Sequence, residues 1–246
     1  MTRFLCFCFC LLTTVPLLAQ SSYTLLIFHK LAPGKTLEDA MPVEREWKAI
    51  NQAAVDEGNL IGWHMLIRQP ASPKPEHADY DYVTCIVTAT KAMKGASPAA
   101  MAKLYGDSVQ VRMAGLQRRD KLTAPVIKVE WFENTDALVG AKFNPAKTKL
   151  ITVDFLKLDE ANGDQASALT ATKKAAILRL NRGNYSGWAF STLMPGTAKA
   201  SYSHAVAHAS ANLKRANDQI IKSPFTVVRH DTFRFGQFTV RPGYER

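Results

Sequence analysis

The chain has 246 residues, of which 47% are hydrophobic and 21% are charged, so it is long and apolar enough to bury a sizeable core. It carries 31 Lys and Arg against 21 Asp and Glu, a formal net charge of +10 that suits an acidic partner. The basic residues are not interleaved with aromatic residues in a nucleic-acid-binding motif, so we expect no nucleic acid partner and interpret them as solvated helix faces.

Residues 1–20 have the pattern of a secretory signal peptide. Arg3 supplies a short positive region, Phe4 to Leu18 is an apolar stretch, and Ala19-Gln20 offers a small-residue cleavage site. The stretch is too short for a membrane-spanning helix, and no second long apolar run follows it. We therefore expect an exported protein, periplasmic or extracellular, with no transmembrane segment after cleavage. The mature chain would keep only Cys85, which we expect to be a buried, inert thiol.

The first half of the mature chain alternates strand-like and helix-like segments. Apolar residues alternate in the strand-like segments and recur at helical spacing in the others. Pro42 stands just ahead of the first helix, Ser97-Pro98 begins the second, and Gly106 is a point at which that helix can bend. In chain order we expect a strand at 23–31, a helix at 43–57, strands at 61–68 and 80–90, a helix at 97–119 and a strand at 126–132.

The second half repeats the first. The segment Gly58–Trp63, G-N-x-x-G-W, returns 125 residues later as Gly183–Trp188. Each copy follows a helix-like segment, and its first glycine suits a helix stop because glycine adopts the left-handed conformation without penalty. The matching elements are a strand at 150–158, a helix at 165–182, strands at 186–193 and 202–210, a helix at 211–222 and a strand at 225–235.

Each half therefore has the order β-α-β-β-α-β, which is the ferredoxin-like order with two helices on one face of a four-stranded antiparallel sheet. The other face of each sheet still carries apolar residues that must be covered. We expect an α+β fold of two tandem ferredoxin-like repeats packed sheet to sheet as an intrachain α/β barrel. The expected division is a signal peptide at 1–20, a first repeat at 22–135, a linker at 136–148 and a second repeat at 149–240.

On this element order and internal repeat, residues 23–240 resemble the dimeric α/β-barrel superfamily, in particular its members with fused tandem repeats. That superfamily includes heme-binding enzymes, cofactor-free monooxygenases, small-lactone isomerases and binding proteins. The resemblance therefore implies a fold but does not specify an activity. The heme enzymes that resemble this chain commonly ligate iron through a histidine on a helix. The four expected helices contain no histidine, so we predict no cofactor.

Candidate ligand-binding residues lie mostly in the second half. His204 and His208 fall on one face of the expected strand at 202–210, and small alanines fall on the other. We interpret the alanines as the helix-facing side, so the histidines would face the barrel interior. Their rings would lie about 13 Å apart along the strand, too far to share a metal ion, and we predict no metal site. The alternative is that both histidines are structural.

Three further residues complete the predicted ligand site. Arg229 and Asp231 come from the last strand, and His64 comes from the first half, where it points away from the face of its neighbour Trp63. The sequence thus predicts a pocket lined mainly by the second half, with His64 contributed by the first.

Two functions remain open. The mature chain has no G-x-S-x-G, P-loop, G-x-G-x-x-G, H-E-x-x-H or C-x-x-C motif that would indicate a known catalytic class. The first function is binding of a small anionic or aromatic molecule without a cofactor. The alternative is an oxidoreductase or monooxygenase of the superfamily, either heme-dependent or cofactor-free. Self-association of the chain is also left open.

Overall fold

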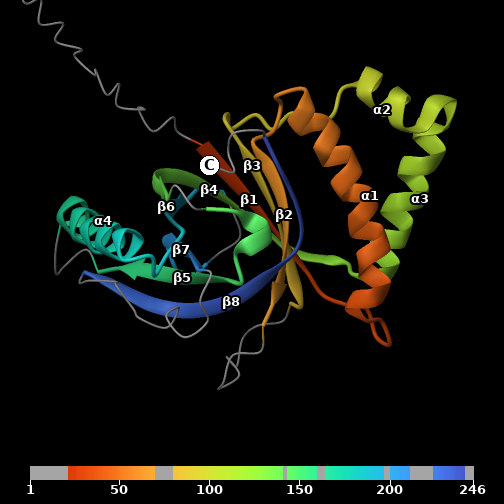
Figure 1. Ribbon diagram of the computed structural model, residues 1–246. Coiled ribbons are helices and arrows are strands. Elements are labelled where there is room, and N and C mark those ends of the chain that lie inside the picture. Colours follow the sequence, from red (N-terminus) through yellow and green to blue (C-terminus); the bar gives the residue numbers. More distant parts are fainter. Residues whose placement is uncertain are drawn as a thin grey trace, which may run out of the picture.

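The computed structural model describes residues 22–69, 80–140, 143–159, 164–196, 200–210 and 224–241. Within them, eight strands form one closed antiparallel barrel in the order β1-β3-β2-β8-β5-β7-β6-β4. Figure 1 shows α1, α2 and α3 on one side of this barrel and α4 on the opposite side. The expected signal peptide and the helix expected at 211–222 lie outside the described residues.

The elements follow one another as predicted, with changed bounds. In chain order they are β1 (Ser22–His29), α1 (Leu37–Asp56), β2 (Gly62–Arg68), β3 (Tyr82–Thr88), α2 (Pro98–Tyr105), the 3-10 helix η1 (Gly106–Ser108), α3 (Val109–Thr123), β4 (Val126–Val139), the 3-10 helix η2 (Pro145–Lys147), β5 (Leu150–Leu158), α4 (Gln165–Asn181), β6 (Gly187–Leu193), β7 (His204–Ser210) and β8 (Phe225–Val240).

The two halves have the same strand order. It is β4-β1-β3-β2 in the first half and β8-β5-β7-β6 in the second, and the halves join through the pairs β2–β8 and β4–β6. Closure leaves neither half with an unpaired sheet edge. The α+β class and the closed barrel are therefore confirmed. The complete second β-α-β-β-α-β repeat stays a prediction because its last helix falls on residues outside those described.

Strand alternation divides the core into an inner and an outer part. The inner cluster fills the barrel and includes Phe28, Phe132 and Phe155. Two outer clusters lie between the barrel wall and the helices: Trp63 packs in the cluster under α1, and Trp188 in the cluster under α4. Both tryptophans are buried core residues, as the repeat predicted.

The repeated glycines end their helices as predicted. Gly58 has a φ of 75° and Gly183 a φ of 69°, both in the left-handed region. The amide of Gly58 donates to the carbonyl of Val55, and the amide of Asn59 donates to that of Ala54. The same two bonds recur around Gly183, which identifies both ends as Schellman caps.

Two helix boundaries differ from the prediction. The first helix begins at Leu37, because Thr36 and Asp39 form a reciprocal capping box ahead of it, and Pro42 lies inside the helix and not before it. The long helix expected at 97–119 is interrupted at Gly106, whose φ of 58° ends α2 before α3 begins. The glycine thus produces a break at the position where the sequence indicated only a bend.

The strand that ends the first half is longer than expected. β4 continues to Val139, into the expected linker, and its last residues pair with β6 of the second half. β8 likewise continues to Val240 and pairs with β2. These two extensions supply the ladders that close the barrel.

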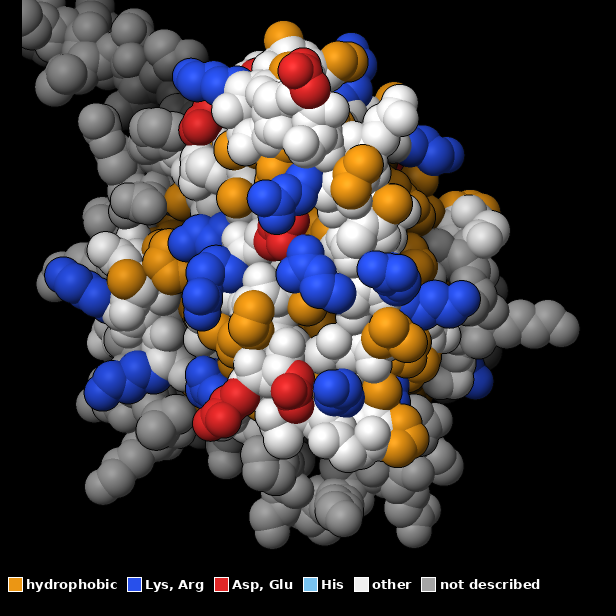
Figure 2. Space-filling view, turned by 90° about the vertical axis from the view of Figure 1, so that its right-hand side faces the viewer, with side chains coloured by type: hydrophobic (Ala, Val, Ile, Leu, Met, Phe, Trp, Pro, Cys, Tyr) orange, Lys and Arg blue, Asp and Glu red, His pale blue; other side chains and the backbone are white. Residues whose placement is uncertain are grey.

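The helical side of the first half is basic. Figure 2 shows Lys and Arg side chains spread over this face, with acidic and apolar side chains between them. Arg119 of α3 forms an ion pair with Glu46 of α1 at 2.5 Å. None of the described helices is long and apolar enough to cross a membrane. The exposed basic residues of α1 to α3 are Arg45, Lys103, Arg112, Arg118, Arg119 and Lys121.

Candidate functional site

A cavity of about 270 Å³ lies inside the barrel. It exists because several strand residues that face inward are small. Ala205, Ala207 and Ala209 follow one another at alternate positions on β7, and Gly187 and Ala189 do the same on the neighbouring β6. Interiors of proteins are otherwise close-packed, so a run of small inward-facing residues leaves a space that larger side chains would fill.

The wall of the cavity is apolar and comes from all eight strands. Both halves of the chain therefore contribute to it, and the expectation that the second half would supply most of it is wrong. The large apolar side chains of the wall are Leu26, Leu66, Val87, Phe132, Val153 and Phe235.

One side of the cavity carries a polar network centred on Asn134 of β4. Its Oδ1 accepts a hydrogen bond from Ser191 at 2.7 Å and one from Thr24 at 3.2 Å. Its Nδ2 donates to Ser22 and to Thr24, each at 2.9 Å. All four hydrogen-bonding positions of the amide are thus used within the protein. These hydrogen bonds connect β1, β4 and β6. They leave the Asn134 amide without a free donor or acceptor for a ligand.

Two polar side chains of the wall are left for a ligand: His64, and His208 through its Nδ1, which is buried and has no hydrogen-bond partner among the described residues. His64 lies on β2 with its ring centroid 5.5 Å from that of Phe235, and no hydrogen bond joins its ring to any other described residue. Burial lowers the pKa of His64 to about 4, so the imidazole is neutral at pH 7. A neutral imidazole has one donor and one acceptor nitrogen, and the cavity wall around His64 is mostly apolar.

The expected facing of β7 is wrong. Val206 packs in the outer cluster under α4, whereas Ala205 packs in the inner cluster. His204 is therefore on the outer face, between the rings of Phe190 and Phe225. Its ring nitrogens bond to Ser203 at 2.8 Å and to Gln165 at 3.1 Å, which gives it the contacts of a structural histidine. Burial lowers its pKa.

His208 belongs to a second group on the outer face. Its Nε2 lies 3.7 Å from an oxygen of Asp154, whose other oxygen lies 2.6 Å from Nδ1 of His230. Burial raises the pKa of Asp154, but the bonds to the two histidines outweigh it and hold that pKa below its usual value. The bond to Asp154 also raises the pKa of His230. His208 contributes atoms to the cavity wall, although its ring packs on Tyr185, 4.8 Å away.

Arg229 and Asp231 lie inside the barrel, but away from the cavity. Asp231 accepts a hydrogen bond from the Tyr80 hydroxyl at 2.5 Å and lies 2.8 Å from Nε of Arg229. The Arg229 guanidinium stands 3.6 Å from the ring centroid of Phe155. Nearby, Glu130 pairs with Lys128 and accepts a bond from the Tyr202 hydroxyl.

This polar group closes the far end of the barrel. Along β4, Asn134 lies at the cavity and Lys128 lies six residues away, which corresponds to about 20 Å. Burial raises the pKa values of Tyr80 and Tyr202, so both hydroxyls remain donors to the carboxylates. Ionic partners surround each carboxylate here, so the arrangement is that of a buried salt-bridge network.

The five residues that the sequence grouped together thus occupy three places. His64 lies in the cavity wall, His204 and His208 lie on the outer face, and Arg229 and Asp231 close the far end of the barrel. Ligand binding by any of them stays a prediction. The alternating alanines of β7 were the signal for the cavity, and the sequence interpretation assigned them to the wrong face.

Cys85 is a buried free thiol in the cavity wall. Burial raises the pKa of this thiol to about 12, so it is protonated at pH 7 and a poor nucleophile. The expectation of an inert cysteine agrees with this environment.

Some proteins of the superfamily that this chain resembles bind heme, but heme does not fit the described residues. Heme iron needs an axial histidine, thiolate, methionine or tyrosine beside a space for the macrocycle. Helices α1 to α4 contain no histidine. The cavity beside His64 holds about 270 Å³, which is small for a tetrapyrrole. The described residues therefore offer no fitting site for heme, and the expectation of a cofactor-free protein stays a prediction.

Solved structures with a similar fold cover most of the chain. A candidate monooxygenase from Fusobacterium nucleatum is similar over 91% of this chain and 95% of its own, with a TM-score of 0.57 and 6% identity. An anthrone oxidase-like protein is similar over 91% and 94%, with a TM-score of 0.51 and 11% identity. A candidate chlorite dismutase is similar over 89% and 96%, with a TM-score of 0.50 and 10% identity.

No protein-family model matches the chain, and no curated protein has a similar sequence. At identities of 6 to 11% the structural similarity shows a shared fold alone and does not assign an activity to this chain.

Proposed function

We propose that this chain, which has the fold of the dimeric α/β-barrel superfamily, binds a small aromatic molecule in the cavity inside its barrel without a cofactor. We propose also that residues 211–222 supply the helix that completes a second ferredoxin-like repeat. The binding proposal depends on one observation, which is an apolar cavity with an unpaired neutral histidine in its wall.

The lining favours an uncharged aromatic ligand over an anion. Among the described residues no Lys or Arg lines the cavity, and a charged group placed there would lose its hydration without gaining a partner. An apolar ring, in contrast, gains about 25 cal/mol for each Å² that it removes from water. The cavity lies just below the usual range for small-molecule sites, roughly 300 to 1,000 Å³, so the ligand must be small.

His64 would fix the orientation of that ligand. Its neutral ring can accept a hydrogen bond from a phenolic hydroxyl or donate one to a carbonyl. Such a bond contributes about 0.5 to 1.5 kcal/mol when both partners would otherwise be solvated. It contributes more if the histidine is otherwise unsatisfied in the apolar wall. A ligand with one oxygen on an aromatic ring therefore matches both features of the site.

A matched pair of ligands tests this assignment. Fluorescence titration would compare 2-naphthol with naphthalene, which differ only in the hydroxyl group. We expect wild-type protein to bind 2-naphthol about tenfold more tightly, since tenfold corresponds to about 1.4 kcal/mol. In His64→Leu the preference should disappear, whereas the outer-face variant His230→Gln should keep it. Absence of binding, or an unchanged preference in His64→Leu, would refute the proposal.

A second candidate function is a cofactor-free oxidoreductase acting on a phenolic or anthrone-like substrate in the same cavity. The names of the structural neighbours, an anthrone oxidase-like protein and a candidate monooxygenase, favour it. The low pKa of His64 counts against it, because a base with a pKa of about 4 takes up a proton weakly at pH 7. Oxygen consumption by purified protein with 2-naphthol or anthrone would support this function, and binding without turnover would exclude it for these substrates.

We propose that the protein acts outside the cytoplasm, on the signal-peptide pattern of residues 1–20. Intact-mass analysis of the exported protein should find a chain that begins just after Ala19 or Gln20. A mass that retains the first twenty residues would contradict this expectation.

A further inference from the structure

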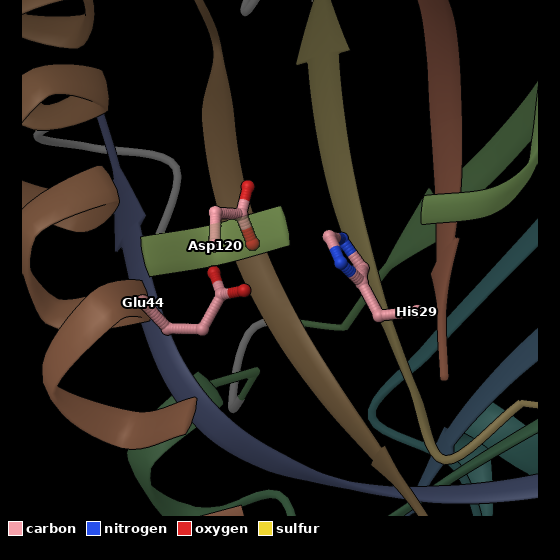
Figure 3. A group of neighbouring side chains, drawn as sticks. All are labelled: His29, Glu44 and Asp120. Atoms are coloured by element: carbon pink, nitrogen blue, oxygen red, sulfur yellow. The ribbon is translucent and has the colours of Figure 1, made fainter. Parts of the chain in front are cut away.

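Another group of polar side chains, distinct from that of His208 and Asp154, lies outside the barrel, between its wall and the helices of the first half. His29 comes from the end of β1, Glu44 from α1 and Asp120 from α3. One ligand atom of each lies within 4.8 Å of the others. Figure 3 shows the two carboxylates and the imidazole turned toward a common space. The group is separate from the cavity, since none of its members lines that space.

Each carboxylate of this group has one oxygen occupied and one oxygen free. The Tyr82 hydroxyl donates to Oε1 of Glu44 at 2.7 Å, and the Trp47 indole donates to Oδ2 of Asp120 at 3.1 Å. The remaining oxygens, Oε2 of Glu44 and Oδ1 of Asp120, are buried and have no hydrogen-bond partner among the described residues. Neutral donors thus orient both carboxylates and leave one oxygen of each available.

The histidine is oriented as well. Nδ1 of His29 lies 3.1 Å from the carbonyl oxygen of Ala124, which can only accept, so Nδ1 carries the proton. Nε2 then has the lone pair, which accepts a hydrogen bond from the Thr84 hydroxyl at 3.0 Å, so a metal ion would replace that hydroxyl as the partner of Nε2. A ring N–H donated to a backbone carbonyl is the usual support of a metal-bound histidine, because it fixes the tautomer and the ring orientation.

Burial makes two adjacent carboxylates costly without a cation. Glu44 is only 1% exposed. Burial raises its pKa to about 8, although the bond from Tyr82 lowers it and the charge of Asp120 raises it. Burial also raises the pKa of Asp120. Two arrangements would relieve this cost: a proton shared between the two free oxygens, or a cation bound by both.

We propose that His29, Glu44 and Asp120 form a binding site for one divalent transition-metal ion, with zinc as the best match. One imidazole nitrogen and two carboxylate oxygens are a donor set that zinc accepts, whereas calcium and magnesium prefer oxygen ligands alone. Ligand atoms on a tetrahedral zinc ion lie about 3.4 Å apart, so each pair of ligand atoms, now within 4.8 Å, needs to approach by at most about 1.4 Å. The ion would join α1 and α3 to β1, and its fourth coordination position would be left to water.

Calorimetric titration of the metal-stripped full-length protein with Zn²⁺ tests this site. We expect one ion per chain, with affinity at least tenfold weaker in Glu44→Gln and in Asp120→Asn. Two control variants should bind as wild type does. Glu46→Gln removes an acid from the same helix, and Asp154→Asn removes the acid of the other histidine group.

If the two carboxylates share a proton instead, the melting temperatures should respond differently to mutation and to zinc. The amide introduced by Glu44→Gln can donate to Asp120 in place of the shared proton, so this variant would keep or raise the melting temperature, and zinc would not change it. Under our proposal zinc raises the melting temperature of wild type and of both controls, and does not raise that of Glu44→Gln or Asp120→Asn. The proposal is overturned if no ion binds with defined stoichiometry, or if Glu44→Gln and wild type bind zinc equally.

Discussion

Enlarging Ala207 tests whether the barrel is hollow. Ala207 lies on β7, opposite Val153 of β5 and Ala189 of β6, and its methyl group lines the cavity. In Ala207→Leu, three additional carbon atoms would enter a space of about 270 Å³. If that space is empty, the new side chain buries apolar surface without displacing its neighbours.

The expected gain follows from the transfer free energy. Three buried carbons contribute about 2.4 kcal/mol at about 0.8 kcal/mol each, from which about 0.5 to 1 kcal/mol is lost in leucine side-chain entropy. We therefore expect the free energy of unfolding to rise by about 1 to 2 kcal/mol. In a domain of this size that corresponds to roughly 2 to 8 °C in melting temperature. Binding of 2-naphthol should weaken in the same variant, because leucine takes part of its space.

Urea denaturation measures this change, and Ala176→Leu is its matched control. Ala176 is fully buried in the outer cluster under α4 and is not among the residues that line the cavity. The same substitution there should cost about 1 to 3 kcal/mol through overpacking. If Ala207→Leu destabilises the protein as much as Ala176→Leu does, then the barrel interior is filled and the account of the cavity is wrong.

Three further predictions concern titration, helix ends and the joining of the halves. His64 has its pKa lowered to about 4 from 6.5, so the unfolded chain binds more protons between these values and the folded state loses stability as the pH falls through them. Relative to wild type, His64→Leu should gain up to about 3 kcal/mol between pH 6.5 and pH 4, and a pH-independent difference in urea unfolding would contradict the burial of His64. Gly58→Ala and Gly183→Ala should each cost about 1 kcal/mol because both glycines have positive φ, whereas Gly115→Ala, inside α3, should stabilise by about 0.5 to 1 kcal/mol. Equal changes in melting temperature at all three positions would refute the assignment of the caps. A chain of residues 21–140 alone loses the β2–β8 and β4–β6 ladders, so light scattering should find dimers or aggregates, and a folded monomer would argue against a barrel closed by both halves.

The internal repeat was sufficient to predict much of this fold. The two copies of G-N-x-x-G-W mark equivalent helix ends, and glycine is required there by the left-handed conformation. Once those ends are aligned, the strands and helices of one half identify those of the other. Closure of the barrel followed because each half has an apolar sheet face to cover. What the repeat could not give was the length of β4 and β8, since pairing between the halves, and not local sequence, extends them.

The candidate site was harder to predict because a strand that is wrong by one residue turns every side chain to the other face. Alanine is compatible with close packing under a helix and equally with the edge of a cavity. Polar histidines suggested the wetter side, but His204 is instead satisfied by neighbours on the outer face. The cross-strand register determines which face His208 occupies. Trp188 pairs with His208, and paired residues share a face, so a tryptophan placed under α4 requires the histidine to lie there too.

The group of His29, Glu44 and Asp120 shows a different limit. Its members lie far apart in the chain and on three different elements, so no spacing in the sequence marks them. They meet because α1 and α3 pack on the same face of the barrel wall beside the end of β1.

A crystal structure of the protein grown with 2-naphthol tests the central claim most directly. We expect electron density for the ring system inside the barrel, between Leu26, Val153 and Phe235, with the naphthol oxygen within hydrogen-bonding distance of a ring nitrogen of His64. A barrel interior filled by ordered water or by the protein's own side chains, with 2-naphthol absent or bound only at the surface, would contradict it.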